Sequence, residues 1–140
     1  MARIIALDYG RKRTGIATTD PLQIIATSIG TIRTHDLFTW LKDYFSKEAV
    51  ETIVLGFPTN TDGEDTDVTQ DVRQLQKKLT KDFPDKTIEL VDERFTSSMA
   101  LRTIREADLK KKDIRNKNLV DAVSATIILQ SFLEKRELKR

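Results

Sequence analysis

Apolar positions near the start of the chain form short runs of the kind that predict strands. Residues 3–7 are an almost continuous apolar run rich in isoleucine, which is typical of a strand covered on both faces near the centre of a sheet. Residues 14–19 and 26–32 are also rich in strand-forming residues, and Asp20-Pro21 breaks the pattern between them. The three segments therefore predict an antiparallel meander.

Further along, the apolar spacing alternates between helical and strand-like. Leu37, Leu41 and Tyr44 fall on one face of a helix that His35 or Asp36 would begin. The other predicted elements are a strand over 52–56, a helix over 68–79, a strand over 87–91, a helix from Thr96 or Ser97 to about 107, and a helix capped by Asn118 that ends at about 133. This order predicts an α/β domain, a mixed five-stranded sheet with helices packed on it.

Length and composition predict one domain over residues 1–140 in a reducing compartment. The 140 residues suit a single domain, and no Pro/Gly/Ser-rich stretch divides them. There are no cysteines, which excludes disulfides, thiolate metal sites and cysteine nucleophiles. No apolar stretch approaches the roughly 20 residues that cross a bilayer, and we see no export signal, so we expect a cytoplasmic protein.

Charge is informative through its placement, because the net charge is only +2. Basic residues gather at 11–13, at 110–117 and at 135–140. Runs of this kind are most often solvated faces. Charge alone therefore does not identify a nucleic-acid-binding protein.

Asp8 is the first carboxylate whose position asks for an explanation. It directly follows the apolar run 3–7, where a carboxylate has to be hydrogen-bonded, paired or bound to a metal ion. A structural role explains it equally well, because an aspartate before a Tyr-Gly turn often accepts local backbone N–H bonds.

Asp121 is the second such carboxylate. Helical spacing groups it with Ser124, Ala125 and Ile128, on the face that is expected to pack on the sheet. The small residues around it would let this end of the helix approach the strands closely. The alternative is that Asp121 stabilises the helix dipole from the first turn.

The third acidic group, Asp92-Glu93-Arg94, follows the fifth predicted strand. Strand alternation sends Asp92 and Glu93 to opposite faces, so only one of them can share a site with Asp8. Three converging carboxylates would raise one another's pKa unless a divalent cation neutralised them, and oxygen ligands suit Mg²⁺ or Mn²⁺. Two such ions could bind both the attacking water and the leaving oxygen of a phosphodiester.

Basic residues beside these acids fit a phosphodiester substrate. Arg11, Lys12, Arg13 and Arg94 could contact its phosphates or stabilise developing charge. We interpret His35 as a helix-start residue and not as a catalyst.

With these residues identified, the sequence resembles the YqgF-like (RuvX) family, small bacterial proteins of the RNase H superfamily that are related to Holliday junction resolvases. Four segments carry the resemblance, LDYGRKRTGIA at 7–17, LGFPTNTDG at 55–63, VDERFTS at 91–97 and LVDAVSATIIL at 119–129. They span nearly the whole chain and are specific in this order and spacing. An Asp-x-Gly after a strand is by itself shared with sugar kinases and actin-like ATPases.

The resemblance implies an RNase H-like sheet in the order 3-2-1-4-5 with the second strand antiparallel. It also implies a catalytic, metal-binding site of Asp8, Glu93 and Asp121, and a role in maturing the 5′ end of pre-16S ribosomal RNA. An alternative that it implies is Holliday junction resolution. Resolvase relatives place their second acid after the fourth strand, where this chain has Gly56-Phe57-Pro58. Glu93 would lie one strand further, roughly 10 Å from the first strand.

Two other classes of function are left open by the residues. One is a non-catalytic nucleic-acid-binding factor, and the other is an ATPase, although ATPases of this type pair two such domains. The expected partner is structured RNA or branched DNA, with no membrane contact, and the expected assembly is a monomer or a homodimer.

Overall fold

The computed structural model describes residues 2–57, 67–92 and 117–138. At positions 67, 68, 92, 117–122, 137 and 138 the description covers the backbone alone. The predicted helix from Thr96 or Ser97 to about 107 lies outside the described residues.

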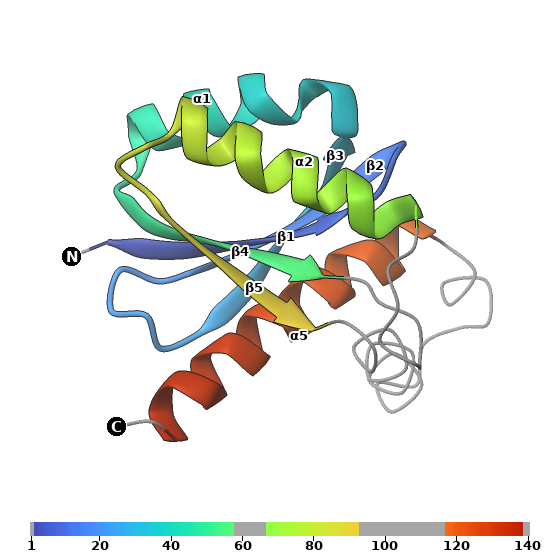
Figure 1. The fold of residues 1–140 in the computed structure, drawn as a ribbon. Coiled ribbons are helices and arrows are strands. Elements are labelled where there is room, and N and C mark those ends of the chain that lie inside the picture. Colours follow the sequence, from blue (N-terminus) through green and yellow to red (C-terminus); the bar gives the residue numbers. More distant parts are fainter. Residues whose placement is uncertain (1, 58–66, 93–116, 139–140) are drawn as a thin grey trace.

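The centre of the molecule is a five-stranded sheet in the order β3-β2-β1-β4-β5 (Figure 1). The strands are β1 (Arg3–Tyr9), β2 (Arg13–Thr19), β3 (Ala26–Arg33), β4 (Val50–Phe57) and β5 (Thr87–Asp92). β2 runs antiparallel to β1 and β3, whereas β4 is parallel to β1 and β5 to β4. The expected strand order and the antiparallel second strand are both confirmed. Short turns suffice for the meander, and the parallel strands need longer crossovers.

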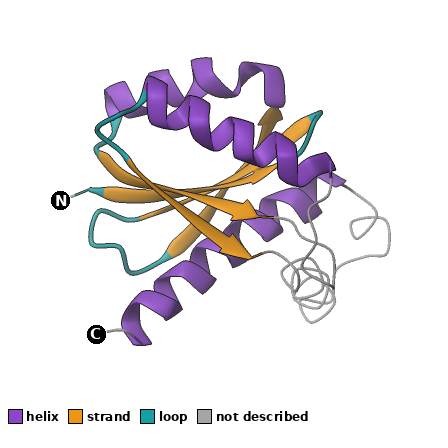
Figure 2. Cartoon of the chain, viewed as in Figure 1, coloured by secondary structure: helices purple, strands orange, loops and turns teal. Residues whose placement is uncertain are grey.

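Helices cover both faces of this sheet (Figures 1 and 2). A short 3-10 turn, η1 (Thr34–Asp36), leads into α1 (Leu37–Lys47), and α1 lies with α2 (Asp67–Asp82) on one face. α5 (Lys117–Leu138) lies on the other face. None of the helices within the described ranges is long and apolar enough to cross a membrane.

The sheet separates two apolar cores, and β1 contributes to both. Ile5 and Leu7 pack towards α1 and α2, whereas Ile4 and Ala6 pack towards α5. Successive side chains of a strand point to opposite faces, so a strand with helices on both sides has to be apolar at every position. This explains the continuous apolar run 3–7.

Several elements extend beyond their predicted ends, α5 most of all. At the start of α1 the prediction holds, because Asp36 is the N-cap and His35 lies in the preceding tighter turn η1. α5 begins at Lys117 and continues to Leu138, five residues beyond the predicted end. Its last turns are polar in sequence, but Arg136 there donates hydrogen bonds to the side-chain oxygen and the carbonyl of Gln23 in the β2–β3 turn. That tertiary contact supports the extra length.

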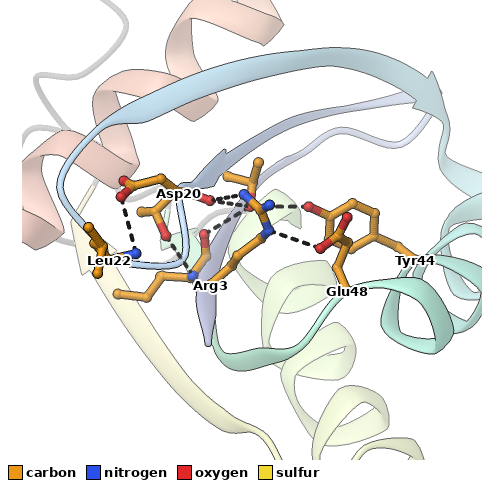
Figure 3. Close-up of polar contacts among 8 residues, drawn as sticks. Arg3, Asp20, Leu22, Tyr44 and Glu48 are labelled. Carbon is orange, nitrogen blue, oxygen red and sulfur yellow. Dashed lines mark hydrogen bonds and ion pairs between the residues drawn. The ribbon is translucent and has the colours of Figure 1, made fainter. Parts of the chain in front are cut away.

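Polar contacts join the elements at the edge of the sheet where β1 begins (Figure 3). The Arg3 guanidinium donates 2.9 Å to the carbonyl of Thr19 and pairs with Glu48 at 3.2 Å. Arg3 thereby links the start of β1 to the end of β2 and to the residue that follows α1. This edge has a structural role, and the opposite edge, where β1 ends, carries Asp8.

Candidate active site

Asp8 lies one residue before the end of β1, the central strand, and its side chain is half-buried. It continues the alternation of Ile4 and Ala6, which pack against α5, and therefore belongs to the α5 face of the sheet. The prediction that Asp8 directly follows a run covered on both faces is confirmed, and the strand itself continues through Asp8 to Tyr9.

Glycines flank Asp8 on both neighbouring strands. Its partner in β2 is Gly15, and in β4 the register Leu7 to Leu55 makes Gly56 the next residue at the level of Asp8. Both glycines are buried. Because residues that face each other across a sheet project to the same side, any other residue at these positions would place a Cβ beside the carboxylate. The two neighbouring strands thus place no side chain on either side of Asp8.

The end of β5 lies on the far side of β4. Val91 is 4% exposed and packs in the core beneath α5, so it faces the same side as Asp8. Asp92 closes the strand opposite Phe57. The side chain of Asp92 and the whole of Glu93 and Arg94 are outside the described residues.

Asp121 is the fifth residue of α5 and lies just past its first turn, which contains no acidic residue, so a role in stabilising the helix dipole from the first turn is not supported. Only the backbone of Asp121 is described. It comes four residues, about one helical turn, before Ala125, which is fully buried in the core with Ala6. The N-terminal end of α5 lies where β4 and β5 end (Figure 1). Within the described side chains, no three of the histidines and acids gather as metal ligands would. The convergence of Asp8, Glu93 and Asp121 therefore stays a prediction.

The turn from β1 to β2 carries the predicted basic residues. It needs a glycine at position 10, because a Cβ there would lie 2.6 Å from the carbonyl oxygen of Arg13. Arg11 is exposed, and its Nε donates 2.7 Å to an Oδ of Asp71 in α2. Lys12 is exposed and Arg13 half-buried. These three residues line one cleft of about 470 Å³ together with Arg33 and His35.

A second cleft of about 270 Å³ opens beside α1 and α2. Tyr9, His35 and Asp71 are among the residues that line it. Burial raises the pKa of the Tyr9 hydroxyl, and the negative charge of Asp71 adds to the effect. The alternation of side chains along a strand could have predicted from the sequence that Tyr9 points to the other face of the sheet from Asp8. Nothing in the sequence indicated Asp71 or Arg33, because their neighbourhood depends on how α2 and β3 pack. His35 lies in η1, as expected of a helix-start residue.

A mixed five-stranded sheet in this order, with helices on both faces and a carboxylate near the end of its central strand, defines an RNase H-like α/β domain. The family model described as "RuvX: Holliday junction resolvase" matches residues 2–135, and the chain belongs to this family. The resemblance inferred from the four sequence segments is thus confirmed.

Curated relatives match over almost the whole chain. One from Bacteroides fragilis, named "Putative pre-16S rRNA nuclease", is 50% identical over 138 residues, which cover 99% of this chain and 100% of the relative. Another of the same name from Porphyromonas gingivalis is 52% identical over 134 residues, 96% of this chain and 97% of the relative. Among solved structures, "YeaZ from Pseudomonas aeruginosa" matches at 17% identity with a TM-score of 0.48 and covers 77% of this chain and 50% of that one.

Proposed function

We propose that this protein is a metal-dependent nuclease that hydrolyses phosphodiester bonds during 5′-end processing of pre-16S ribosomal RNA. The observation that carries the proposal is Asp8, a half-buried carboxylate near the end of the central strand with glycines at both neighbouring positions. With glycine at both positions, neither neighbouring strand places a side chain between this carboxylate and a ligand. The names of the relatives supply the substrate.

We assign the active site to Asp8, Glu93 and Asp121. α5 begins near the strand ends, and the residues one turn after Asp121 pack on the α5 face of the sheet. Glu93 follows Val91 by two positions in the sequence, the spacing at which a strand returns to one face, and Val91 faces the side of Asp8. This spacing favours Glu93 over Asp92 as the third carboxylate.

Carboxylate oxygens fit a hard divalent cation, and the glycines beside Asp8 place no side chain against it, so we propose Mg²⁺ or Mn²⁺ as the cofactor. When bound, such an ion would polarise the phosphoryl oxygen and lower the pKa of a bound water. The acids would hold the cation, and Arg11, Lys12, Arg13 and Arg94 would hold the flanking phosphates by charge-assisted hydrogen bonds.

Cleavage of an RNA that spans the 5′ end of 16S rRNA, with Mg²⁺, Mn²⁺ or EDTA, tests the proposal. Asp8→Asn keeps the size and hydrogen-bonding ability of the side chain but removes its charge. We expect a loss of cleavage of at least about 100-fold, because even outer-shell partners of a metal ligand contribute 10–100-fold. Asp43→Asn is the matched control, since Asp43 is exposed on α1 and pairs only with Lys47 among the described residues. Equal cleavage by the wild type and Asp8→Asn would remove Asp8 from the mechanism.

Resolution of branched DNA is the second candidate, because the matching family model is described as a Holliday junction resolvase. Symmetric cleavage of a four-way junction by a dimer would favour it. A strictly monomeric mass in solution would count against it, because a two-fold junction calls for a two-fold enzyme. Salt-dependent binding without cleavage of either substrate would instead indicate a non-catalytic binding factor.

A further inference from the structure

Thr34 joins two segments that lie far apart in the sequence. Its backbone N–H donates 3.0 Å to the carbonyl of Lys12, and its hydroxyl contacts the carbonyl of Gly10 and, at 2.9 Å, the hydroxyl of Thr14. The β1–β2 turn and the β3–η1 junction are therefore held side by side. Arg33 and His35, on either side of Thr34 in the sequence, come to lie beside residues 11–13.

The cleft between these segments is strongly basic. Arg11, Lys12, Arg13, Arg33 and His35 line it, and no acidic side chain of the described residues does so. Two of the five are paired with acids outside the lining, Arg11 with Asp71 at 2.7 Å and His35 with Asp36 at 3.1 Å. Lys12 and Arg33 are exposed, and within the described chain no ion pair is found for either. The cleft therefore keeps a net positive charge.

Two of these basic residues face each other across neighbouring strands. Arg13 in β2 and Arg33 in β3 are direct cross-strand partners, and like charges at such positions are destabilising. Local choices that oppose folding are expected mainly where function requires them. A polyanion bound in the cleft would compensate the repulsion.

We propose that this cleft binds the phosphodiester backbone of the nucleic acid beside the site of cleavage, and that Arg33 is a substrate-binding residue. The proposal rests on the proposed function, from which it takes a nucleic acid as the ligand. Asp8 pairs with Gly15 in β2, Gly15 pairs with Thr31 in β3, and Arg33 lies two residues further towards the same edge. A strand bound at Asp8 can thus continue across β2 to β3, and flanking phosphates reach Lys12 and Arg33.

Equilibrium binding without cleavage tests this proposal. The full chain with Asp8→Asn, in EDTA, is titrated with a fluorescein-labelled single-stranded RNA from the 16S leader at several salt concentrations. We expect Arg33→Gln to weaken binding several-fold near 100 mM salt. It should also lower the slope of log affinity against log salt by about 0.7, the value for one phosphate contact in a single strand. Lys81→Gln is the matched control, because Lys81 is exposed in the last turn of α2 and lines none of the clefts described here.

The outcomes separate this proposal from the nuclease assignment. Unchanged affinity and slope for Arg33→Gln would overturn the proposal that the cleft binds nucleic acid. The absence of salt-dependent RNA binding by the wild type would also overturn it. Metal-dependent cleavage by the wild type is measured independently. If the wild type cleaves RNA but Arg33→Gln leaves binding unchanged, only the proposal for the cleft is overturned. If Arg33→Gln weakens binding but the wild type does not cleave RNA, only the nuclease assignment is overturned. Matching thermal unfolding curves for all variants exclude misfolding as the cause.

Discussion

At the scale of single residues, the candidate site depends on the two glycines beside Asp8 as much as on Asp8 itself. Gly15 and Gly56 weaken their strands, because glycine loses more conformational freedom on folding than any other residue. Both are buried in the middle of the sheet, where a β-branched residue would be more stable. Their presence is explained if a ligand has to approach the carboxylate without meeting a side chain from either neighbouring strand.

Gly15→Ala tests this explanation. The added methyl group would project beside Asp8 from its direct partner in β2. We expect metal-dependent cleavage to fall at least about tenfold, which corresponds to about 1.4 kcal/mol of lost transition-state stabilisation. Urea unfolding should change by no more than the ~1–3 kcal/mol typical of a crowded core. Activity equal to that of the wild type would show that the reaction does not require a position without a side chain beside Asp8.

At the scale of elements, the β2–β3 turn shows how one side chain organises a connection. Asp20 accepts backbone N–H bonds from Leu22 at 3.1 Å and from Ile24 and Ile25 at 2.8 Å. Gln23 in the same turn has a φ of 60°, which is uncommon for a residue other than glycine. Its side chain contacts the carbonyl of Ala2 at 2.8 Å, the carboxylate of Glu51 and the guanidinium of Arg136. The turn is therefore tied to β4 and α5.

The backbone N–H groups that Asp20 accepts hold its pKa below the usual value of 3.8, with the bond from Ile25 contributing most. Since the folded-state pKa is lowered, the stabilisation is fully present above the unfolded pKa and is lost as the pH falls through the folded pKa. We expect Asp20→Asn to be less stable than the wild type in urea unfolding at neutral pH, with the difference shrinking below pH 3.8. A difference that is constant with pH would show that the charge of Asp20 is not involved.

At the scale of the whole molecule, one sheet couples two cores. Leu41 of α1 and Leu129 of α5 are both fully buried, on opposite faces. The inner strands β2, β1 and β4 each pair with two neighbouring strands and contribute buried residues to both cores. The geometry of Asp8 therefore depends on both faces, although the candidate site opens on only one.

Leu41→Ala and Leu129→Ala test this coupling. Each should lower the free energy of unfolding by about 2–5 kcal/mol, the usual effect of deleting a buried leucine side chain. Far-UV circular dichroism and Trp40 fluorescence should report one coincident transition in both variants, because the cores share the sheet. Separate transitions for Leu129→Ala would show that α5 unfolds independently.

Much of the fold could be predicted because its signals are local. The run 3–7, the break at Asp20-Pro21 and the helical spacing from Leu37 determine strands, turn and helix through the geometry of neighbouring residues. The strand order came with the family resemblance and agrees with the sheet observed. The predicted end of α5 is five residues too early, since Gln23, the partner of Arg136, is remote in the sequence.

The candidate site divides in the same way. Asp8 could be recognised from the sequence alone, because a carboxylate directly after a buried strand is anomalous wherever that strand packs. Its glycine neighbours, and the meeting of Arg33 and His35 with residues 11–13, depend on cross-strand register and on the hydrogen bonds of Thr34. Register and packing join residues that are distant along the chain, and no local pattern of hydrophobic and polar positions encodes which of them will meet.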